Sequence, residues 1–358
     1  MYFVKKTSYQ QDMDHFKHNG QRFWYGLLLV TVLLTPTQLS DFYLGELSFV
    51  YIYAIAGIGL MLLVGYTGLV SLGHAAFLAI GAYAHASMLT QGVPFTASIV
   101  LATLLTAVVG GIVGLPALRM TGIYLAVATL AFAIIVEQII AHWDSVTGGF
   151  RGMAVPDAEI FGMSLMDPVS YYYLCLIILI ACVFLALNLL RSPSGRAMIA
   201  VRDSEISAQS MGINLLRTKS AAFAISAGFT GAAGALFSHK IGYLSPDSFT
   251  LLTSIQLLLM VVVGGLGSLQ GVVYGAIFVG TLPQVIAVMK DTLPAVIGQL
   301  PGLEPGIFGL ILVLFLIYEP LGIYGRWQKI RRYFEEFPLY RRATYKRQKS
   351  YLRTERVR

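Results

Sequence analysis

Unbroken runs of apolar residues constrain this 358-residue sequence more than any other feature. A helix that crosses a bilayer needs about 20 mostly apolar residues, and these runs do not alternate in polarity as the strands of a membrane barrel do. Only 12% of the residues are charged, against about 25% in soluble domains. A soluble enzyme, a disordered chain and a disulfide-rich secreted domain are therefore excluded. We expect an all-α polytopic membrane protein with about ten transmembrane helices, near residues 23–39, 48–64, 73–91, 95–115, 122–142, 171–190, 220–239, 251–267, 271–289 and 306–323.

The charges of the loops orient the chain. Lys and Arg gather in the cytoplasmic loops of membrane proteins. Counted from a cytoplasmic N-terminus, the basic loop 191–219 falls inside, and the acidic loops 40–47, 143–170 and 290–305 fall outside. We therefore expect both termini to be cytoplasmic. This topology divides the chain into a cytoplasmic N-terminal segment (1–22), a transmembrane domain (23–325) and a basic cytoplasmic tail (326–358).

The tail carries twelve Lys or Arg and three Glu, while the net charge of the whole chain is +7. Such a segment can lie on anionic lipid. A basic stretch can also bind nucleic acid, which would be a more specific function than lipid binding. This stretch follows a membrane domain, however, and has no recognition motif. We expect a lipid membrane as a partner, and no nucleic acid.

Two glycine-rich segments interrupt the apolar runs. At an offset of 197 residues they match at Gly68 and Gly265, and at Ser71 and Ser268. Matching interrupted spans in two halves point to a transporter's pathway, where freed backbone groups can bind a zwitterion. Small residues also permit close packing of helices, and the sequence leaves both interpretations open. The loop count places both breaks at the cytoplasmic side, which means a parallel repeat.

Ionisable residues within predicted spans mark candidate functional sites, and two of them are assigned to the pathway. His74 follows the first break, and it either belongs to the pathway or starts a helix with its ring bonded to a neighbouring carbonyl. Glu137 lies late in its span, where it lines a wet cavity, pairs with a second subunit or reaches the interface. The predicted translocation pathway therefore consists of Gly68, Ser71, His74, Glu137, Gly265 and Ser268.

The inside loop 191–219 is predicted to contain a docking element. Pro and Gly turn the chain, and a short amphipathic helix follows. Glu205, Ala208 and Gly212 share one face of that helix because their spacings are three and four. Arg196 and Arg202 supply polar contacts. This helix either docks into a groove on a cytoplasmic partner or is an ordinary solvated loop helix.

No enzymatic site is predicted. The sequence lacks a His-Glu-x-x-His motif and a Gly-x-x-x-x-Gly-Lys-[Ser/Thr] phosphate loop, so another chain would have to bind ATP. Cys175 and Cys182 lie about 10 Å apart along one helix, which is too far for a disulfide, and two thiols alone make no zinc site. We expect no catalytic residue, metal or cofactor in this chain.

Several motifs in order resemble one known family, the inner-membrane permease subunits of bacterial ABC importers for branched-chain amino acids. The resemblance covers about residues 45–325. It rests on Gly65-Tyr-Thr-Gly-Leu-Val-Ser-Leu-Gly-His-Ala-Ala-Phe77, Leu118-Arg-Met-Thr-Gly-Ile-Tyr-Leu-Ala126, Trp143-Asp-Ser-Val-Thr-Gly-Gly149, Ser192-Pro-Ser-Gly-Arg196, Ala227-Gly-Phe-Thr-Gly-Ala-Ala-Gly-Ala-Leu236 and Gly264-Gly-Leu-Gly-Ser268.

The resemblance implies an ABC importer permease fold in the bacterial inner membrane. Such a permease pairs with a second, related permease and is driven by two cytoplasmic ATPase subunits, which bind ATP and Mg. A periplasmic binding protein delivers branched-chain or related amino acids to it. Loop 191–219 would be the coupling loop that contacts the ATPases, with Glu205, Ala208 and Gly212 at the positions of the family's Glu-Ala-…-Gly pattern.

The sequence departs from the family at one place and leaves the substrate open. Where the family often has a Glu, and an Arg three residues on, this chain has Ile134 and Glu137. Relatives within the family move urea, short amides or aromatic acids. The alternatives from other classes are an ion-coupled secondary transporter, which would use Glu137 and need no ATPase, and a membrane-embedded enzyme.

Overall fold

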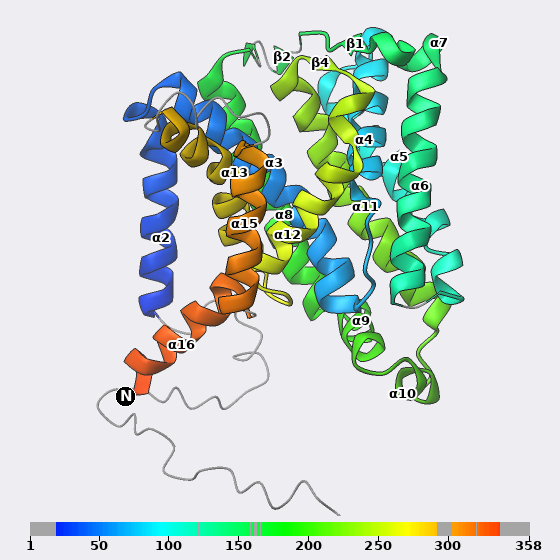
Figure 1. The fold of residues 1–358 in the computed structure, drawn as a ribbon, viewed down its shortest axis with the longest axis vertical. Coiled ribbons are helices and arrows are strands. Elements are labelled where there is room, and N and C mark those ends of the chain that lie inside the picture. The colour runs from blue at the N-terminus through cyan, green and yellow to red at the C-terminus, as the bar shows by residue number, and fades with distance from the viewer. Residues whose placement is uncertain are drawn as a thin grey trace, which may run out of the picture.

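The structure is a computed structural model that describes residues 19–120, 122–157, 159–160, 163–164, 166–291, 303–319 and 321–336. Helices make up most of the described chain (Figure 1). Parts of the predicted N-terminal segment and of the basic tail lie outside the described residues. In chain order the helices are α2 (Asn19–Leu34), α3 (Asp41–Met61), α4 (His74–Thr90), α5 (Phe95–Val113), α6 (Ile123–His142), α7 (Asp144–Thr147), α8 (Pro168–Arg191), α9 (Pro193–Asp203), α10 (Glu205–Ser210), α11 (Leu215–Ile241), α12 (Leu251–Gly264), α13 (Leu269–Asp291), α15 (Leu303–Tyr318) and α16 (Gly322–Glu336).

Each of the ten predicted spans falls on a helix, and the prediction of a polytopic helical membrane protein is confirmed. Seven helical segments within the described residues are long and apolar enough to cross a membrane: 41–66, 95–113, 123–142, 168–191, 215–241, 246–264 and 269–290. The other three predicted spans fall on α2, α4 and α15, which have 16, 17 and 16 residues. The count of ten therefore stays a prediction.

Exposed apolar faces identify helices at the outside of the bundle. On α5, Val100, Leu104 and Val108 form a stripe at a spacing of four, and each is more than half exposed. Ile135 and Ile139 form a similar stripe on α6. Apolar surface of this extent marks an interaction site, and on helices of this length and hydropathy it faces lipid or another membrane subunit.

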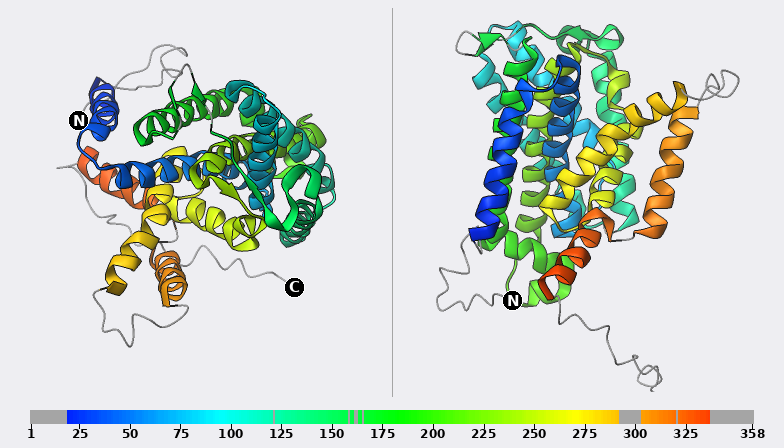
Figure 2. Two further views of the ribbon diagram at one scale, coloured as in Figure 1. Left: turned by 90° about the horizontal axis from the view of Figure 1, so that it is seen from above. Right: turned by 90° about the vertical axis from the view of Figure 1, so that its left-hand side faces the viewer.

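Helix α11 runs through the middle of the bundle, packed against α3, α4 and α5 (Figure 2). The contacts depend on glycine. A Cβ atom added to Gly81 of α4 would lie 2.2 Å from the carbonyl oxygen of Gly231, and one added to Gly234 would lie 2.1 Å from that of Leu78. Small residues let membrane helices approach backbone to backbone in this way.

The last helices stand at one edge of the bundle. Helices α12 and α13 form a close hairpin, because a Cβ atom added to Gly275 would lie 2.1 Å from the carbonyl oxygen of Met260. Helix α15 packs against α12 and α13 and projects from the remaining helices (Figure 2).

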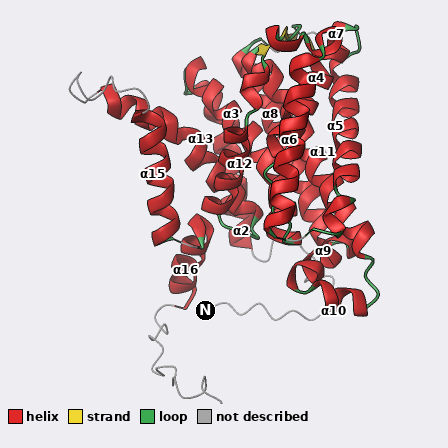
Figure 3. Ribbon diagram, turned by 45° about the vertical axis from the view of Figure 1, so that its right-hand side comes forward, coloured by secondary structure: helices red, strands yellow, loops and turns green. Residues whose placement is uncertain are grey.

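The two ends of the molecule differ, as Figure 3 shows. At one end α9, α10 and α16 extend beyond the bundle; we call this the α9–α10 end. At the opposite end, the strand end, β1 (Met153–Ala154) pairs antiparallel with β4 (Tyr243–Leu244), and β2 (Glu159–Ile160) pairs with β3 (Met163–Ser164).

Helix α8 begins beside these strands at a well-formed cap. The carboxylate of Asp167 accepts hydrogen bonds from the Ser170 hydroxyl and from the Ser170 amide. The bond from the Ser170 hydroxyl has the larger effect, and both bonds lower the pKa of Asp167. The cap fixes where the chain leaves the strand end and enters the bundle.

Candidate functional site

The first glycine-rich break lies between α3 and α4. Helix α3 ends in a wider π-helical turn over Leu62–Tyr66, and the chain then leaves helical geometry until α4 begins at His74. Gly68 has a φ of 74°, in the left-handed region that glycine adopts without a steric penalty. The glycine therefore permits the break, and the backbone beyond it is freed from helical pairing.

The second break lies between α12 and α13. Gly265 and Gly267 have φ values of 116° and 82°. The hydroxyl of Ser268 accepts a hydrogen bond from the amide of Gly271 at 3.1 Å and so caps the start of α13. The predicted interruption of this span is confirmed.

The two breaks meet at the α9–α10 end. The amide of Gly267 donates to the sulfur of Met61 at 3.1 Å, and a Cβ atom added to Gly65 would lie 2.8 Å from the nitrogen of Gly267. Both breaks therefore lie at the same side of the bundle, as a parallel repeat requires.

Arg202 of α9 reaches into the junction of the breaks. One of its terminal guanidinium nitrogens donates to the carbonyl oxygen of Gly65 at 2.9 Å. A Cβ atom added to Gly68 would lie 3.0 Å from Cγ of Arg202, and one added to Gly267 would lie 3.9 Å from a guanidinium nitrogen. The guanidinium also pairs with Asp203 at 3.0 Å. The sequence predicted a polar contact with a partner for Arg202, whereas the structure directs this side chain inward onto both breaks.

His74 ties the first break to the core of the bundle. Its Nδ1 hydrogen-bonds with the Ser71 hydroxyl at 3.1 Å, and its Nε2 with the Ser226 hydroxyl of α11 at 2.9 Å. All three residues are fully buried. The ring is bonded to two hydroxyls rather than to the neighbouring carbonyl of the alternative interpretation, and both nitrogens are occupied. His74 and Ser71 therefore position the break.

Two further hydrogen bonds hold the same segment. The amide of Leu72 donates to the hydroxyl of Thr129 on α6 at 3.0 Å, and the amide of Ala75 donates to the hydroxyl of Ser254 on α12 at 2.9 Å. Buried backbone amides outside a helix need such partners. No local pattern predicts these bonds, because each joins residues far apart in the chain.

Glu137 is not part of this junction. It lies on α6, eight residues after Thr129 and so about 12 Å further along the helix. Its side chain is half-buried. The structure thus separates Glu137 from the other predicted pathway residues, and its predicted role stays untested.

The loop 191–219 differs from its prediction in its helices. The chain forms two helices, α9 and α10, rather than one, because Ser204 is extended and its hydroxyl caps α10 at the Ser207 amide. Gly212 lies beyond α10 with a φ of 86° and open space around it. The prediction that Glu205, Ala208 and Gly212 share one helix face was therefore wrong for Gly212.

The two remaining residues of that face point toward the protein. Ala208 is buried, and Glu205 forms an ion pair with Lys219 of α11 at 2.8 Å, with side-chain exposures of 36% and 0%. The ammonium of Lys219 also donates to the Ala117 carbonyl. A fully buried Lys needs such a partner. The guanidinium of Arg196, near the start of α9, donates a hydrogen bond to the carbonyl of Arg191.

Two large apolar side chains of the loop face outward among its exposed polar residues. Ile206 is 84% exposed and Met211 is 82% exposed. Large apolar side chains so open to solvent at one end of a membrane protein favour a protein partner. The sequence analysis did not identify Ile206 and Met211, because it considered only the small and charged residues of the loop.

Replacing Glu205 by Lys should detach α10 from α11. Removing one partner of a buried ion pair costs about 3–5 kcal/mol, and the partial exposure of Glu205 places this pair at the low end. The local opening of residues 204–214 should rise about tenfold or more, measured as faster amide hydrogen exchange. The matched variant Gln209→Lys introduces the same lysine side chain on the exposed side of α10 and should leave exchange unchanged. Equal exchange in both variants would contradict the pairing.

Comparisons with known proteins agree on one family. Residues 42–317 match a family described as the branched-chain amino acid transport system permease component. The high-affinity branched-chain amino acid transport system permease proteins LivM of Salmonella typhimurium and of Escherichia coli K12 are each 32% identical to this chain over 328 residues, which are 85% of this chain and 75% of each relative. The corresponding LivH protein of E. coli K12 is 23% identical over 293 residues, which are 76% of this chain and 91% of the relative. No solved structure gives a significant match.

Proposed function

This chain belongs to the family of branched-chain amino acid transport system permease components, and from that premise we propose that it is the membrane permease subunit of an ATP-driven ABC importer. Its cargo would be branched-chain or related amino acids, as the names of the relatives indicate. It would act in the bacterial inner membrane, with the α9–α10 end in the cytoplasm and the strand end facing a periplasmic binding protein.

The observation that carries the proposal is that Arg202 hydrogen-bonds the first break at Gly65 and lies beside the second break at Gly267. The same short helix that holds Arg202 leads directly into α10, whose Ile206 is exposed. A partner that moves α9 and α10 therefore acts on the backbone at Gly65 and Gly267. This is the mechanical link that an importer needs between an energy source outside the membrane and a gate within it.

The energy source would be a separate pair of ATPase subunits, which bind ATP and Mg. This chain has no phosphate loop and contains no Gly-Lys dipeptide. Ile206 and Met211 would insert into an apolar groove of the ATPase. The ion pair between Glu205 and Lys219 would keep α10 in place against α11.

The second permease would be a related chain rather than a second copy. The match to LivM is stronger than the match to LivH in the same organism. A chain that resembles one of two permease types more closely fits a pair of paralogues.

The test is co-purification from the native host followed by uptake into proteoliposomes. We expect the chain to bring down an ATPase pair and a second permease, and the complex to import leucine only with ATP and the binding protein. Recovery of this chain alone, together with leucine uptake that needs no ATP, would overturn the proposal in favour of an ion-coupled transporter.

The contact itself can be tested with Ile206→Asp combined with Met211→Asp. These changes place two carboxylates where we expect an apolar groove, and burying unpaired carboxylates is strongly unfavourable. We expect the ATPase subunits to be lost from the purified complex. Leu321→Asp is the matched control, because Leu321 is an exposed apolar residue at the same end but outside the loop; it should retain them. Retention in the double variant would show that α10 is not the ATPase contact.

A further inference from the structure

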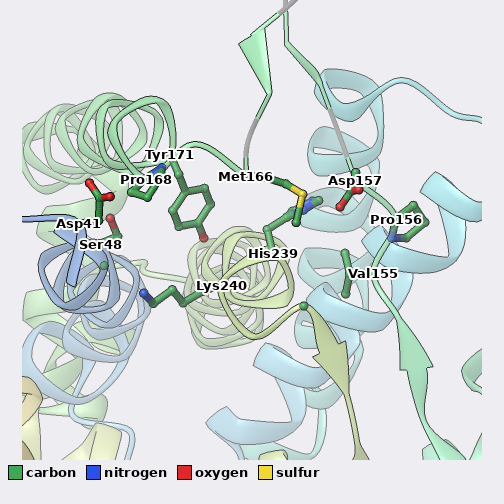
Figure 4. Close-up of a pocket in the computed structure, with 12 residues that line it drawn as sticks. Asp41, Ser48, Val155, Pro156, Asp157, Met166, Pro168, Tyr171, His239 and Lys240 are labelled. Atoms are coloured by element: carbon green, nitrogen blue, oxygen red, sulfur yellow. The ribbon is translucent and has the colours of Figure 1, made fainter. Parts of the chain in front are cut away.

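A cavity of about 250 Å³ opens at the strand end of the bundle, opposite to the junction of the breaks (Figure 4). Its walls come from α3, α8, the last turn of α11 and the loop that follows β1. Pockets for drug-sized ligands measure about 300–1,000 Å³, so this cavity suits a smaller solute. The residues that matter below are Asp41, Ser48, Val155, Asp157, Met166 and Lys240.

Lys240 supplies a positive charge inside the cavity. Its ammonium lies over Gly45 of α3, where a Cβ atom would be only 2.6 Å away. Figure 4 shows the side chain of Lys240 extending toward α3, the helix that carries Asp41 and Ser48. The side chain is half-buried, and within the described residues no carboxylate lies within ion-pairing distance of it. A cation in this position gains free energy when an anionic group binds beside it.

The other lining residues lie on two sides of the cavity, and each side carries a carboxylate. Asp41 precedes Gly45 by one turn of α3 and so lies on the same face. Val155 and Met166 provide apolar surface on the opposite side, where Asp157 also lies. With one cation and two carboxylates around it, the cavity disfavours a ligand with net negative charge.

The neighbouring polar groups are already satisfied by the protein. Nε2 of His239 hydrogen-bonds with Nε2 of His85 at 2.9 Å, and the Tyr171 hydroxyl donates to the Leu236 carbonyl at 2.6 Å. The Ser48 hydroxyl donates to the Leu44 carbonyl. The charged groups that can recognise a ligand are the ammonium of Lys240 and the carboxylates of Asp41 and Asp157.

We propose that this cavity is an outer binding site that receives a zwitterionic α-amino acid before translocation. The carboxylate of the ligand binds the ammonium of Lys240, and its ammonium binds the carboxylate of Asp41. Its apolar side chain lies against Val155 and Met166. The inference rests on the proposed function and adds to it the residues that first hold the cargo.

The main test compares Lys240→Gln with wild type in the complete transporter, reconstituted with its binding protein, ATP and radiolabelled leucine. A hydrogen bond to a charged group contributes about 1.5–3 kcal/mol, so we expect the maximal uptake rate to fall about tenfold or more. The concentration of binding protein at half-maximal rate should not change. Lys240→Arg keeps the charge and should retain most of the uptake. Lys290→Gln removes a charge from the end of α13, outside the cavity, and should behave as wild type.

Each outcome separates the two proposals. If wild type imports no amino acid, the proposed function fails. If wild type imports leucine and Lys240→Gln does so equally well, only the outer site is overturned. A raised requirement for binding protein at an unchanged maximal rate would show that Lys240 contacts that protein instead, which also overturns the site. Yield and elution volume on size exclusion establish that the variant is folded.

A second measurement reads out the site directly. Met166 is 72% exposed at the cavity, and both native cysteines are buried, so Met166→Cys provides one reactive thiol. Leucine at millimolar concentration should slow its alkylation severalfold, whereas leucinamide, which lacks the carboxylate, should not. Adding Lys240→Gln should abolish the protection. Equal protection by the two probes would overturn the assignment of Lys240.

Discussion

Replacing Gly81 by Val should prevent α4 and α11 from packing as they do in the native bundle. A Cβ atom at residue 81 would lie 2.2 Å from the carbonyl oxygen of Gly231 and 2.5 Å from its Cα atom. Both are backbone atoms, so no change of rotamer relieves the clash. Overpacking typically costs about 1–3 kcal/mol, and a clash with rigid backbone belongs above that range.

Helix α11, which carries Gly231, cannot move away from α4. A Cβ atom added to Gly231 would itself lie 2.6 Å from the Cβ atom of Thr106 on α5. Helix α11 is therefore held between α4 and α5 at one level. Because proteins are stable by only about 5–15 kcal/mol, we expect Gly81→Val to lose most of the monodisperse protein in mild detergent and to lower the thermal midpoint of the remainder.

Gly26 is the matched control. It also lies within a helix, α2, but no heavy atom lies within 4 Å of an added Cβ atom. Gly26→Val should leave yield and thermal midpoint near those of wild type. A Gly81→Val protein with the wild-type midpoint would contradict the close crossing of α4 and α11.

The positions of the helices and of the two breaks could be predicted from the sequence because each has a local cause. Apolar runs of bilayer length determine where the helices lie. Gly68 and Gly265 interrupt them because left-handed backbone favours glycine. The division of the loop 191–219 into two helices also has a local signal, because Ser204 followed by Glu205 is typical of a helix start. The prediction of one helix used the spacing of residues 205, 208 and 212 instead.

The direction of the charged side chains could not be predicted in the same way. Arg202 and Glu205 are polar residues in a loop that is predicted to be cytoplasmic, and most such residues face water. Arg202 turns inward because its partner Gly65 comes from a distant part of the chain, and Glu205 does so because Lys219 lies on the next helix, α11. The position of Lys240 beside Gly45 is likewise absent from any local pattern, because the predicted span 220–239 indicates only that Lys240 follows a span.

Replacing Arg202 by Ala should separate ATP hydrolysis from transport. The bond from its guanidinium to the Gly65 carbonyl joins α9 to the first break, and in the proposed importer it would transmit the motion of α9. A bond from a charged donor contributes about 1.5–3 kcal/mol. If that bond biases the gate between two states, its loss shifts their ratio by about 10- to 100-fold. We expect the rate of ATP-dependent leucine uptake to fall by that factor.

The ATPase subunits should remain bound to Arg202→Ala, because Ile206 and Met211 form a separate, outward surface. ATP hydrolysis should persist but lose its stimulation by the loaded binding protein, since the signal no longer crosses from the breaks to α9. Arg196→Ala is the control on the same helix, because Arg196, near the start of α9, donates to the carbonyl of Arg191, the last residue of α8. Arg202→Lys retains a charge but not the planar, multidentate donor, so its uptake should lie between the two. Wild-type uptake in Arg202→Ala would show that the breaks are moved by some other contact, and the link from the coupling loop to the pathway would have to be sought along α11.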